Sequence, residues 1–139
     1  ASCIALYHAI SGEVQTAGLI EKWYREKKIL LPLIKGNDLQ LLLYAGKESL
    51  KTGAFGISEP TEDCIAVQER EIDLIIVPGV AFDRQRNRLG RGKGFYDRLL
   101  STLDIPKIGV CYDFQLKDRI PVEPFDQKMD LIITEKEIV

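Results

Sequence analysis

The stretch that decides the fold is IDLIIVPGVAFDRQRNRLGRGKGFYD, residues 72–97. It begins with a nearly continuous apolar run at residues 72–77 that ends at Pro78-Gly79, as is typical of a central strand in a parallel sheet covered on both faces. Residues 95–103 (FYDRLLSTL) have the pattern of a helix. A strand, a glycine-rich loop and a helix in this order predict that the loop lies at the carboxyl edge of the sheet.

The rest of the chain continues the alternation of strands and helices. Residues 2–7 predict a strand, and residues 16–26 predict a helix with its apolar side chains on one face. Residues 29–34 and 39–44, joined by KGND, predict a hairpin, and Pro32 favours an edge position for its first strand. Residues 45–71 read as loop. The remaining predicted strands are residues 108–111 and 131–134. The expected fold class is α/β.

Length and composition indicate one ordinary domain. The chain has 139 residues, 45% of them hydrophobic and 29% charged, with a net charge of −2. No apolar run approaches the ~20 residues of a membrane span, and three widely spaced cysteines indicate neither a disulfide framework nor a zinc site. We therefore expect a cytoplasmic protein, monomeric or weakly dimeric, that binds neither nucleic acid nor membrane.

The glycine-rich loop has the features of an anion-binding site. Gly90, Gly92 and Gly94 permit close approach of an anion to the backbone. Charged donors are supplied by Arg88, Arg91 and Lys93. Neither the P-loop pattern nor the dinucleotide pattern GxGxxG is matched. The spacing alone therefore indicates phosphate binding, and a tight turn with solvated charges remains the alternative.

With its flanks, the sequence VPGVAFDRQRNRLGRGKGFYD (residues 77–97) resembles the signature of the 5-formyltetrahydrofolate cyclo-ligase family. Three other stretches resemble that family in the same order: ALYHAISGEVQT at residues 5–16, FGISEP at residues 55–60 and PVEPFDQKMDLIIT at residues 121–134. The resemblance implies a single domain over residues 1–139. It also implies a three-layer, mostly parallel sheet with flanking helices, like that of sugar-phosphate isomerases and CoA-transferases. Family members usually carry a further helical segment before this domain, which we expect to be absent here.

The resemblance also implies the reaction and its residues. The family uses ATP and Mg²⁺ to convert 5-formyltetrahydrofolate into 5,10-methenyltetrahydrofolate, with ADP and phosphate as the other products. The implied nucleotide contacts are Arg88, Leu89, Gly90, Arg91, Gly92, Lys93, Gly94, Phe95 and Tyr96. The implied folate contacts are His8, Glu13, Phe55, Arg91, Gly92, Lys93, Gly94 and Phe95. Catalytic roles fall to Arg91, Lys93 and Tyr96, and Asp97 and Asp130 are the implied metal ligands.

Other interpretations stay open at this point. Asp97 also suits the first turn of a helix, and Asp130 the start of a strand. Two other functions are compatible with the bare pattern. One is a nucleic-acid-binding module that uses the basic segment RQRNRLGRGK, residues 84–93, and the other is a phosphate-binding sugar-phosphate isomerase that needs no ATP.

Overall fold

A six-stranded sheet forms the centre of the protein in a computed structural model that describes residues 1–10, 12–52, 58–61 and 64–139. The strand order is β11-β9-β6-β1-β2-β3, and every neighbouring pair is parallel except the β2–β3 hairpin. The strands are β1 (Cys3–Ala5), β2 (Lys28–Lys35), β3 (Asp38–Leu43), β6 (Leu74–Val77), β9 (Lys107–Val110) and β11 (Leu131–Ile133). The predicted α/β class and mostly parallel sheet are confirmed.

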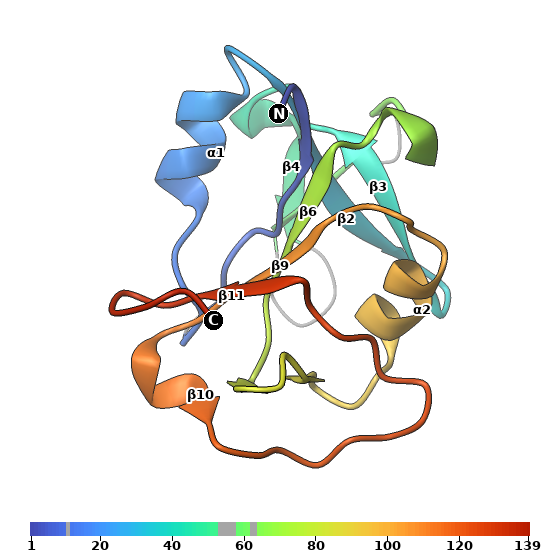
Figure 1. Cartoon of the computed structure of the whole chain (residues 1–139). Coiled ribbons are helices and arrows are strands. Elements are labelled where there is room, and N and C mark those ends of the chain that lie inside the picture. Colours follow the sequence, from blue (N-terminus) through green and yellow to red (C-terminus); the bar gives the residue numbers. More distant parts are fainter. Residues whose placement is uncertain (11, 53–57, 62–63) are drawn as a thin grey trace.

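One helix covers each face of the sheet (Figure 1). Alternate residues of β1 point to opposite faces, so Ile4 packs with Ile20 of α1 (Ala17–Trp23) in one apolar cluster. On the other face, Ala5 shares a second cluster with Leu100 of α2 (Phe95–Ser101). Both clusters consist of buried side chains, and the sheet between two helices gives the three layers.

A second, smaller sheet lies below the carboxyl ends of the central strands in Figure 1. It consists of β10 (Leu116–Lys117), β7 (Ala81–Asp83) and β8 (Arg88–Leu89). Phe82, which is fully buried, packs directly on β9 at Gly109. A Cβ at Gly109 would lie 2.5 Å from the Phe82 ring, so this contact requires a residue without a side chain.

The buried Asp83 carboxylate holds the turn between β7 and β8. It accepts hydrogen bonds from the backbone N–H groups of Gln85 and Asn87, both at 3.0 Å, and from the Asn87 side chain at 3.0 Å. It also accepts the N–H of Ile120 at 3.3 Å, which ties the later segment to this turn. Burial alone would raise the pKa of Asp83, but these hydrogen bonds outweigh it and lower the pKa below its ordinary value.

Two expectations about the first half of the chain are wrong. Residues 45–71 include a short antiparallel pair, β4 (Leu50–Thr52) and β5 (Ser58–Pro60), and two 3-10 turns, η1 (Lys47–Ser49) and η3 (Glu69–Glu71). The strand with Pro32, β2, is also internal, and β3 is the edge. Proline is tolerated there because β1 pairs with β2 only as far as Leu30, which leaves Pro32 without a partner strand on that side.

Two further observations concern the chain as a whole. Cys3, Cys64 and Cys111 are free thiols, of which Cys3 and Cys111 are buried. Within the described ranges, we find no helix with the length and apolar character needed to cross a membrane.

The close approach at Gly109 predicts opposite effects for two glycine-to-alanine substitutions. Gly109→Ala should lower the free energy of unfolding by about 2 kcal/mol, because its methyl group must displace the Phe82 ring. Gly18→Ala in α1 should raise it by about 0.5 kcal/mol, because no atom lies within 4 Å of the added methyl group. Urea denaturation measures both, and a Gly109→Ala variant as stable as the wild type would contradict the packing described.

The Asp83 network predicts a pH-dependent contribution to stability. Because the pKa of Asp83 is lower in the folded state than its ordinary 3.8, the carboxylate stabilises the fold above that value, and the contribution is lost as the pH falls through the folded pKa. Asp83→Asn should cost about 2 kcal/mol at pH 7 and progressively less below pH 3.8. The exposed Asp118→Asn is the control, and an equal cost for both variants would refute the role of Asp83.

Candidate functional site

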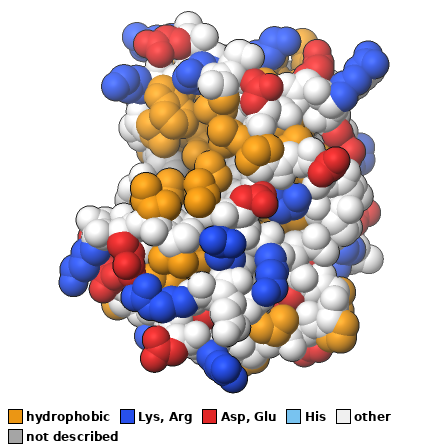
Figure 2. Space-filling view, in the orientation of Figure 1, with side chains coloured by type: hydrophobic (Ala, Val, Ile, Leu, Met, Phe, Trp, Pro, Cys, Tyr) orange, Lys and Arg blue, Asp and Glu red, His pale blue; other side chains and the backbone are white. Residues whose placement is uncertain are grey.

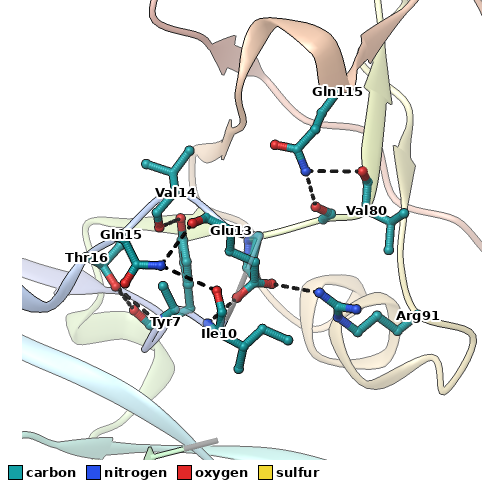
Figure 3. A network of polar contacts seen from close by, with 12 residues as sticks. Tyr7, Ile10, Glu13, Val14, Gln15, Thr16, Val80, Arg91 and Gln115 are labelled. Atoms are coloured by element: carbon teal, nitrogen blue, oxygen red, sulfur yellow. Dashed lines mark hydrogen bonds and ion pairs between the residues drawn. The ribbon is translucent and has the colours of Figure 1, made fainter.

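Three connecting segments come together around the glycine loop at the carboxyl edge of the sheet. They are residues 6–10 and 12–16 after β1, the turn at residues 78–80 after β6, and residues 111–115 after β9, which include η4 (Asp113–Gln115). Figure 3 shows side chains from these segments in one view, with Glu13 facing Arg91 of the loop and Gln115 reaching the turn at Val80. The loop itself runs from β8 to α2, with Gly92 at φ 93° and Gly94 at φ 71°, conformations that favour glycine. The prediction that the loop lies at this edge is confirmed.

Arg88 lies beneath the loop rather than in solvent. It is 7% exposed, and its Nε donates a hydrogen bond of 2.6 Å to the carbonyl of Pro78. Its guanidinium lies 5.0 Å from the centre of the Tyr96 ring and against Gly90, where a Cβ would be 3.0 Å from Nη1. Burial lowers the pKa of Arg88. In the part of the chain that the structure describes, no carboxylate lies within 4.0 Å of this guanidinium.

Glu13 and Arg91, two residues expected in the site, face each other (Figure 3). Glu13 Oε1 accepts the backbone N–H of Ile10 at 3.0 Å, while its Oε2 lies 3.9 Å from Arg91 Nη2. The Glu13 side chain is 10% exposed and that of Arg91 is 54% exposed. The pair therefore joins a buried carboxylate after β1 to an accessible cation of the glycine loop.

The hydroxyl groups of Tyr7 and Tyr96 lie near the carboxylate of Glu13. The hydroxyl of Tyr7 donates to the carbonyl of Val14 at 2.8 Å. Burial, with Glu13 as a further cause, raises the pKa of Tyr7 well above its usual range. Burial also raises the pKa of Tyr96, where the charge of Arg88 opposes the shift and Glu13 adds to it. Both hydroxyls are therefore protonated at neutral pH, and Tyr96 can donate a hydrogen bond there but cannot act as a base.

The other residues predicted to contact the substrates lie farther from Glu13 and Arg91, or fall outside the described residues. His8 lines a shallow groove with Ala17 and Tyr44, on the α1 side of the molecule. Lys93 is exposed in the loop, and Phe95 begins α2, where Arg98 lies 5.5 Å from its ring centre. Phe55 falls outside the described residues, so its expected folate contact is untested.

Asp97 has a carboxyl neighbour, Asp126, that was not expected from the sequence. Its Oδ1 accepts the N–H of Gln127 at 3.3 Å, and the carboxyl group of Asp126 lies beside it. Burial raises the pKa of Asp97 and Asp126 adds to the rise, against the Gln127 N–H and the charge of Arg88. Asp130 is instead engaged at the start of β9, where its Oδ2 accepts the N–H of Lys107 at 2.8 Å.

The closing segment thus places Asp126 beside Asp97, and the expected pairing of Asp97 with Asp130 as metal ligands stays a prediction. The described residues contain no group of three or more His, Cys, Asp and Glu side chains that could hold a metal by themselves. A metal at Asp97 would therefore need further oxygen ligands from elsewhere.

Sequence reasoning missed two polar residues near the site. Asp126 lies in the stretch PVEPFDQKMD that resembled the family, but spacing alone could not say which of its two aspartates turns toward Asp97. Gln115 is buried, and its side chain donates to the carbonyls of Gly79 and Val80 at 3.4 and 3.2 Å. Its position just after a parallel strand was the signal that could have identified it.

The distribution of surface charge is relevant to the alternative function, a nucleic-acid-binding module that uses residues 84–93. On the face shown in Figure 2, Lys and Arg side chains are interspersed with Asp and Glu and form no continuous basic area. Arg84, at the start of the basic segment, is paired with Glu137 at 2.7 Å. The segment at residues 84–93 thus includes a paired cation and the buried Arg88, so fewer of its charges are available than the sequence suggests.

The proximity of Asp97 and Asp126 predicts a change that NMR can measure. In Asp126→Asn the pKa of Asp97 should fall toward its ordinary value, because a neighbouring negative charge is removed. In Asp130→Asn it should stay as in the wild type, because the carboxylate of Asp130 bonds to Lys107. Carboxyl-carbon titrations follow Asp97 in each protein. A shift in Asp130→Asn but not in Asp126→Asn would restore the pairing expected from the sequence.

Comparisons with known proteins agree with the resemblance seen in the sequence. A model of the family described as "5-formyltetrahydrofolate cyclo-ligase family" matches residues 1–135. The 5-formyltetrahydrofolate cyclo-ligase of Haemophilus influenzae is 37% identical, with 88% of this chain and 70% of that protein covered. That of Escherichia coli K12 is 33% identical, with 99% of this chain and 80% of that protein covered.

Solved structures give the same result. The NMR structure of Aquifex aeolicus 5,10-methenyltetrahydrofolate synthetase matches with a TM-score of 0.87 and 42% identity, over 99% of this chain and 70% of that one. The synthetase from Mycoplasma pneumoniae matches with a TM-score of 0.74 and 27% identity, over 95% and 72% of the two chains. These matches support the ligase interpretation and neither of its two alternatives. The chain belongs to the 5-formyltetrahydrofolate cyclo-ligase family.

Proposed function

We propose that this protein catalyses the ATP-dependent cyclisation of 5-formyltetrahydrofolate to 5,10-methenyltetrahydrofolate, with release of ADP and phosphate. The observation that carries the proposal is the buried guanidinium of Arg88 beneath Gly90. A buried charge without a counter-charge is costly, and an anion bound at the loop above it would offset that cost. The family relationship supports the nucleotide phosphates as that anion.

The loop above Arg88 suits a chain of phosphates. No atom lies within 4 Å of the Cβ that Gly92 lacks, so the backbone there is open to a ligand. Arg91 and Lys93 are exposed on either side of it and can supply charge-assisted hydrogen bonds to phosphate oxygens. We assign the nucleotide contacts to Arg88–Tyr96 on this basis, with Arg88 acting by its charge from below.

Glu13 supports a folate site next to the phosphates. Its buried carboxylate has one oxygen fixed by Ile10, and the other is directed toward Arg91. A carboxylate held in this way is a suitable acceptor for the N–H groups of a pterin ring. Arg91 lies between Glu13 and the loop, so it can meet the formyl oxygen and the γ-phosphoryl group together. His8 would contact the folate from the α1 side.

The proposed chemistry needs positioning and charge neutralisation, with no covalent bond to the protein. The formyl oxygen attacks the γ-phosphorus and ADP leaves; N10 then attacks the activated formyl carbon, and phosphate leaves as the five-membered ring closes. Arg91 and Lys93 neutralise the charge of the transferred group, and the protonated hydroxyl of Tyr96 can donate a hydrogen bond to an oxygen within the site.

Asp97 and Asp126 are the residues that we propose would hold Mg²⁺. Burial is the main cause of the raised pKa of Asp97, and the adjacent carboxyl group of Asp126 adds to it; a hard cation would relieve both effects. Mg²⁺ is usually bound by one or two carboxylates, with phosphate and water oxygens as its other ligands, which agrees with the small number of protein ligands here. When bound, the ion would neutralise charge on the nucleotide phosphates.

Two broader assignments are also proposals. The parallel strand order with one helix on each face supports kinship with the fold group of sugar-phosphate isomerases and CoA-transferases. The three free thiols support a reducing compartment such as the cytoplasm.

The proposed activity is tested by mixing the protein with 5-formyltetrahydrofolate, ATP and Mg²⁺ and recording the near-ultraviolet absorbance of the methenyl product. The wild type should form product only when ATP is present. Folded wild-type protein that forms no product would refute the assignment. Asp126→Asn should lower kcat at least tenfold, roughly the effect of losing one group from a metal site.

Two matched variants make the metal assignment specific. Asp118→Asn removes an exposed carboxylate remote from α2 and should leave kcat unchanged. Asp130→Asn distinguishes the two pairings, since a larger loss of kcat in Asp130→Asn than in Asp126→Asn would favour the pairing expected from the sequence.

A further inference from the structure

The turn at residues 78–80, between β6 and β7, has its carbonyl groups held by two side chains. Arg88 Nε donates to the carbonyl of Pro78 at 2.6 Å. Gln115 Nε2 donates to the carbonyls of Val80 and Gly79 at 3.2 and 3.4 Å, the second being the weaker contact. Both side chains are buried, at 7% and 8% exposure, so neither bond is readily replaced by water. Figure 3 shows Gln115 reaching the turn from the segment after β9.

Gln115 is itself held in a single orientation. Its side-chain Oε1 accepts the backbone N–H of Tyr112 at 2.8 Å, and the backbone N–H of Gln115 donates to the carbonyl of Tyr112 at 2.9 Å. The amide group is thus an acceptor toward η4 and a donor toward the turn. A carboxamide supplies this combination from two separate atoms, an oxygen that accepts and a nitrogen with two N–H donors.

The position of the turn determines where the glycine loop begins. The N–H of Val80 donates to the carbonyl of Leu89 at 2.8 Å, and Ala81 pairs with Leu89 in the β7–β8 ladder. Gly79 has no room to move inward, because a Cβ there would lie 3.0 Å from the Phe82 ring. A displacement of the turn at residues 78–80 would therefore also move Leu89 and Gly90, where the glycine loop leaves the small sheet.

We propose that Gln115 is a positioning residue for the nucleotide loop, acting through the turn at residues 78–80. The inference rests on the proposed role of that loop in binding ATP. Carbonyl oxygens carry partial negative charge, so carbonyls released by the loss of Gln115 are free to turn toward a bound phosphate and repel it. By holding two of them, Gln115 maintains the loop in the conformation in which Arg88 supports Gly90 from below.

The segments that hold the folate are independent of this contact. Glu13 is held by Ile10 and faces Arg91, and no hydrogen bond of Gln115 reaches residues 6–16 among those that the structure describes. Removal of the Gln115 amide should therefore weaken nucleotide binding more than folate binding. A merely structural role would instead lower the melting temperature and affect both ligands alike.

The experiment compares Gln115→Met and Gln115→Glu with the wild type. Calorimetry gives the Kd of ADP with Mg²⁺, and steady-state kinetics give KM for ATP and for 5-formyltetrahydrofolate separately. In Gln115→Met, which keeps the length of the side chain but has no amide, all three hydrogen bonds of the amide are lost. The Kd of ADP and the KM for ATP should rise about tenfold, the scale of one or two neutral hydrogen bonds. The KM for the folate should change less than twofold.

Gln115→Glu sharpens the test, because a carboxylate still accepts the Tyr112 N–H but cannot donate to the turn. Nucleotide binding should weaken more than in Gln115→Met, since a negative charge now faces two carbonyl oxygens. Gln85→Met, at an exposed position in the β7–β8 turn, is the matched control and should bind ADP as the wild type does.

The outcomes separate this inference from the proposed function. A folded Gln115→Met variant with unchanged Kd for ADP, or with equal losses for nucleotide and folate, would overturn the role of Gln115 alone. A wild-type protein that binds no ADP and no ATP would overturn the proposed function and this inference with it.

Discussion

The site depends on the contacts made by the buried guanidinium group of Arg88. It bonds to the end of the central strand through Pro78, lies against the glycine loop at Gly90 and packs over the Tyr96 ring at the start of α2. A strand, a loop and a helix thus share one side chain. A charge kept out of water with no ion-pair partner among the described residues is unfavourable for folding, and its position under the proposed anion-binding loop would give it a function.

Carboxylates surround this cation at longer range. The charges of Asp97, Glu13 and Asp126 all act on the pKa of Arg88 without forming an ion pair with it. Each of them has its own backbone N–H donor, from Gln127, Ile10 and Glu123 respectively. The protein therefore fixes its acidic groups with its own backbone and does not use them to neutralise Arg88. The guanidinium charge stays available to a ligand.

The strands of the central sheet and the two helices could be predicted from the sequence, and the short strands outside that sheet could not. The six central strands and two helices follow from apolar runs and helical periodicity, within a few residues at each end. Strands of two or three residues, such as β8 and β10, have no period to detect. The contact of Phe82 with Gly109 and the internal position of Pro32 both depend on which segments become neighbours, which is tertiary information.

The same limit applies to the site. The glycine loop and its cations were identified from residue type and spacing, but the sequence could not distinguish the buried Arg88 from the exposed Arg91. It also gave no reason to prefer Asp126 over Asp130, since the two are four residues apart on one irregular segment. Gln115 has an unremarkable sequence context. Its role becomes apparent only when the segment after β9 is seen beside the turn after β6.

The bond from Ile120 to Asp83 has a consequence for how the protein folds. It joins residues 37 positions apart, and the loop of the site is completed only when the segment after β10 has docked on the β7–β8 turn. Contacts of long sequence separation form slowly, because much of the chain must be ordered before they are gained. The central sheet contains still longer connections, since Ile4 of β1 pairs with Leu74 of β6, so the site requires that the chain be ordered from β1 to the segment after β10.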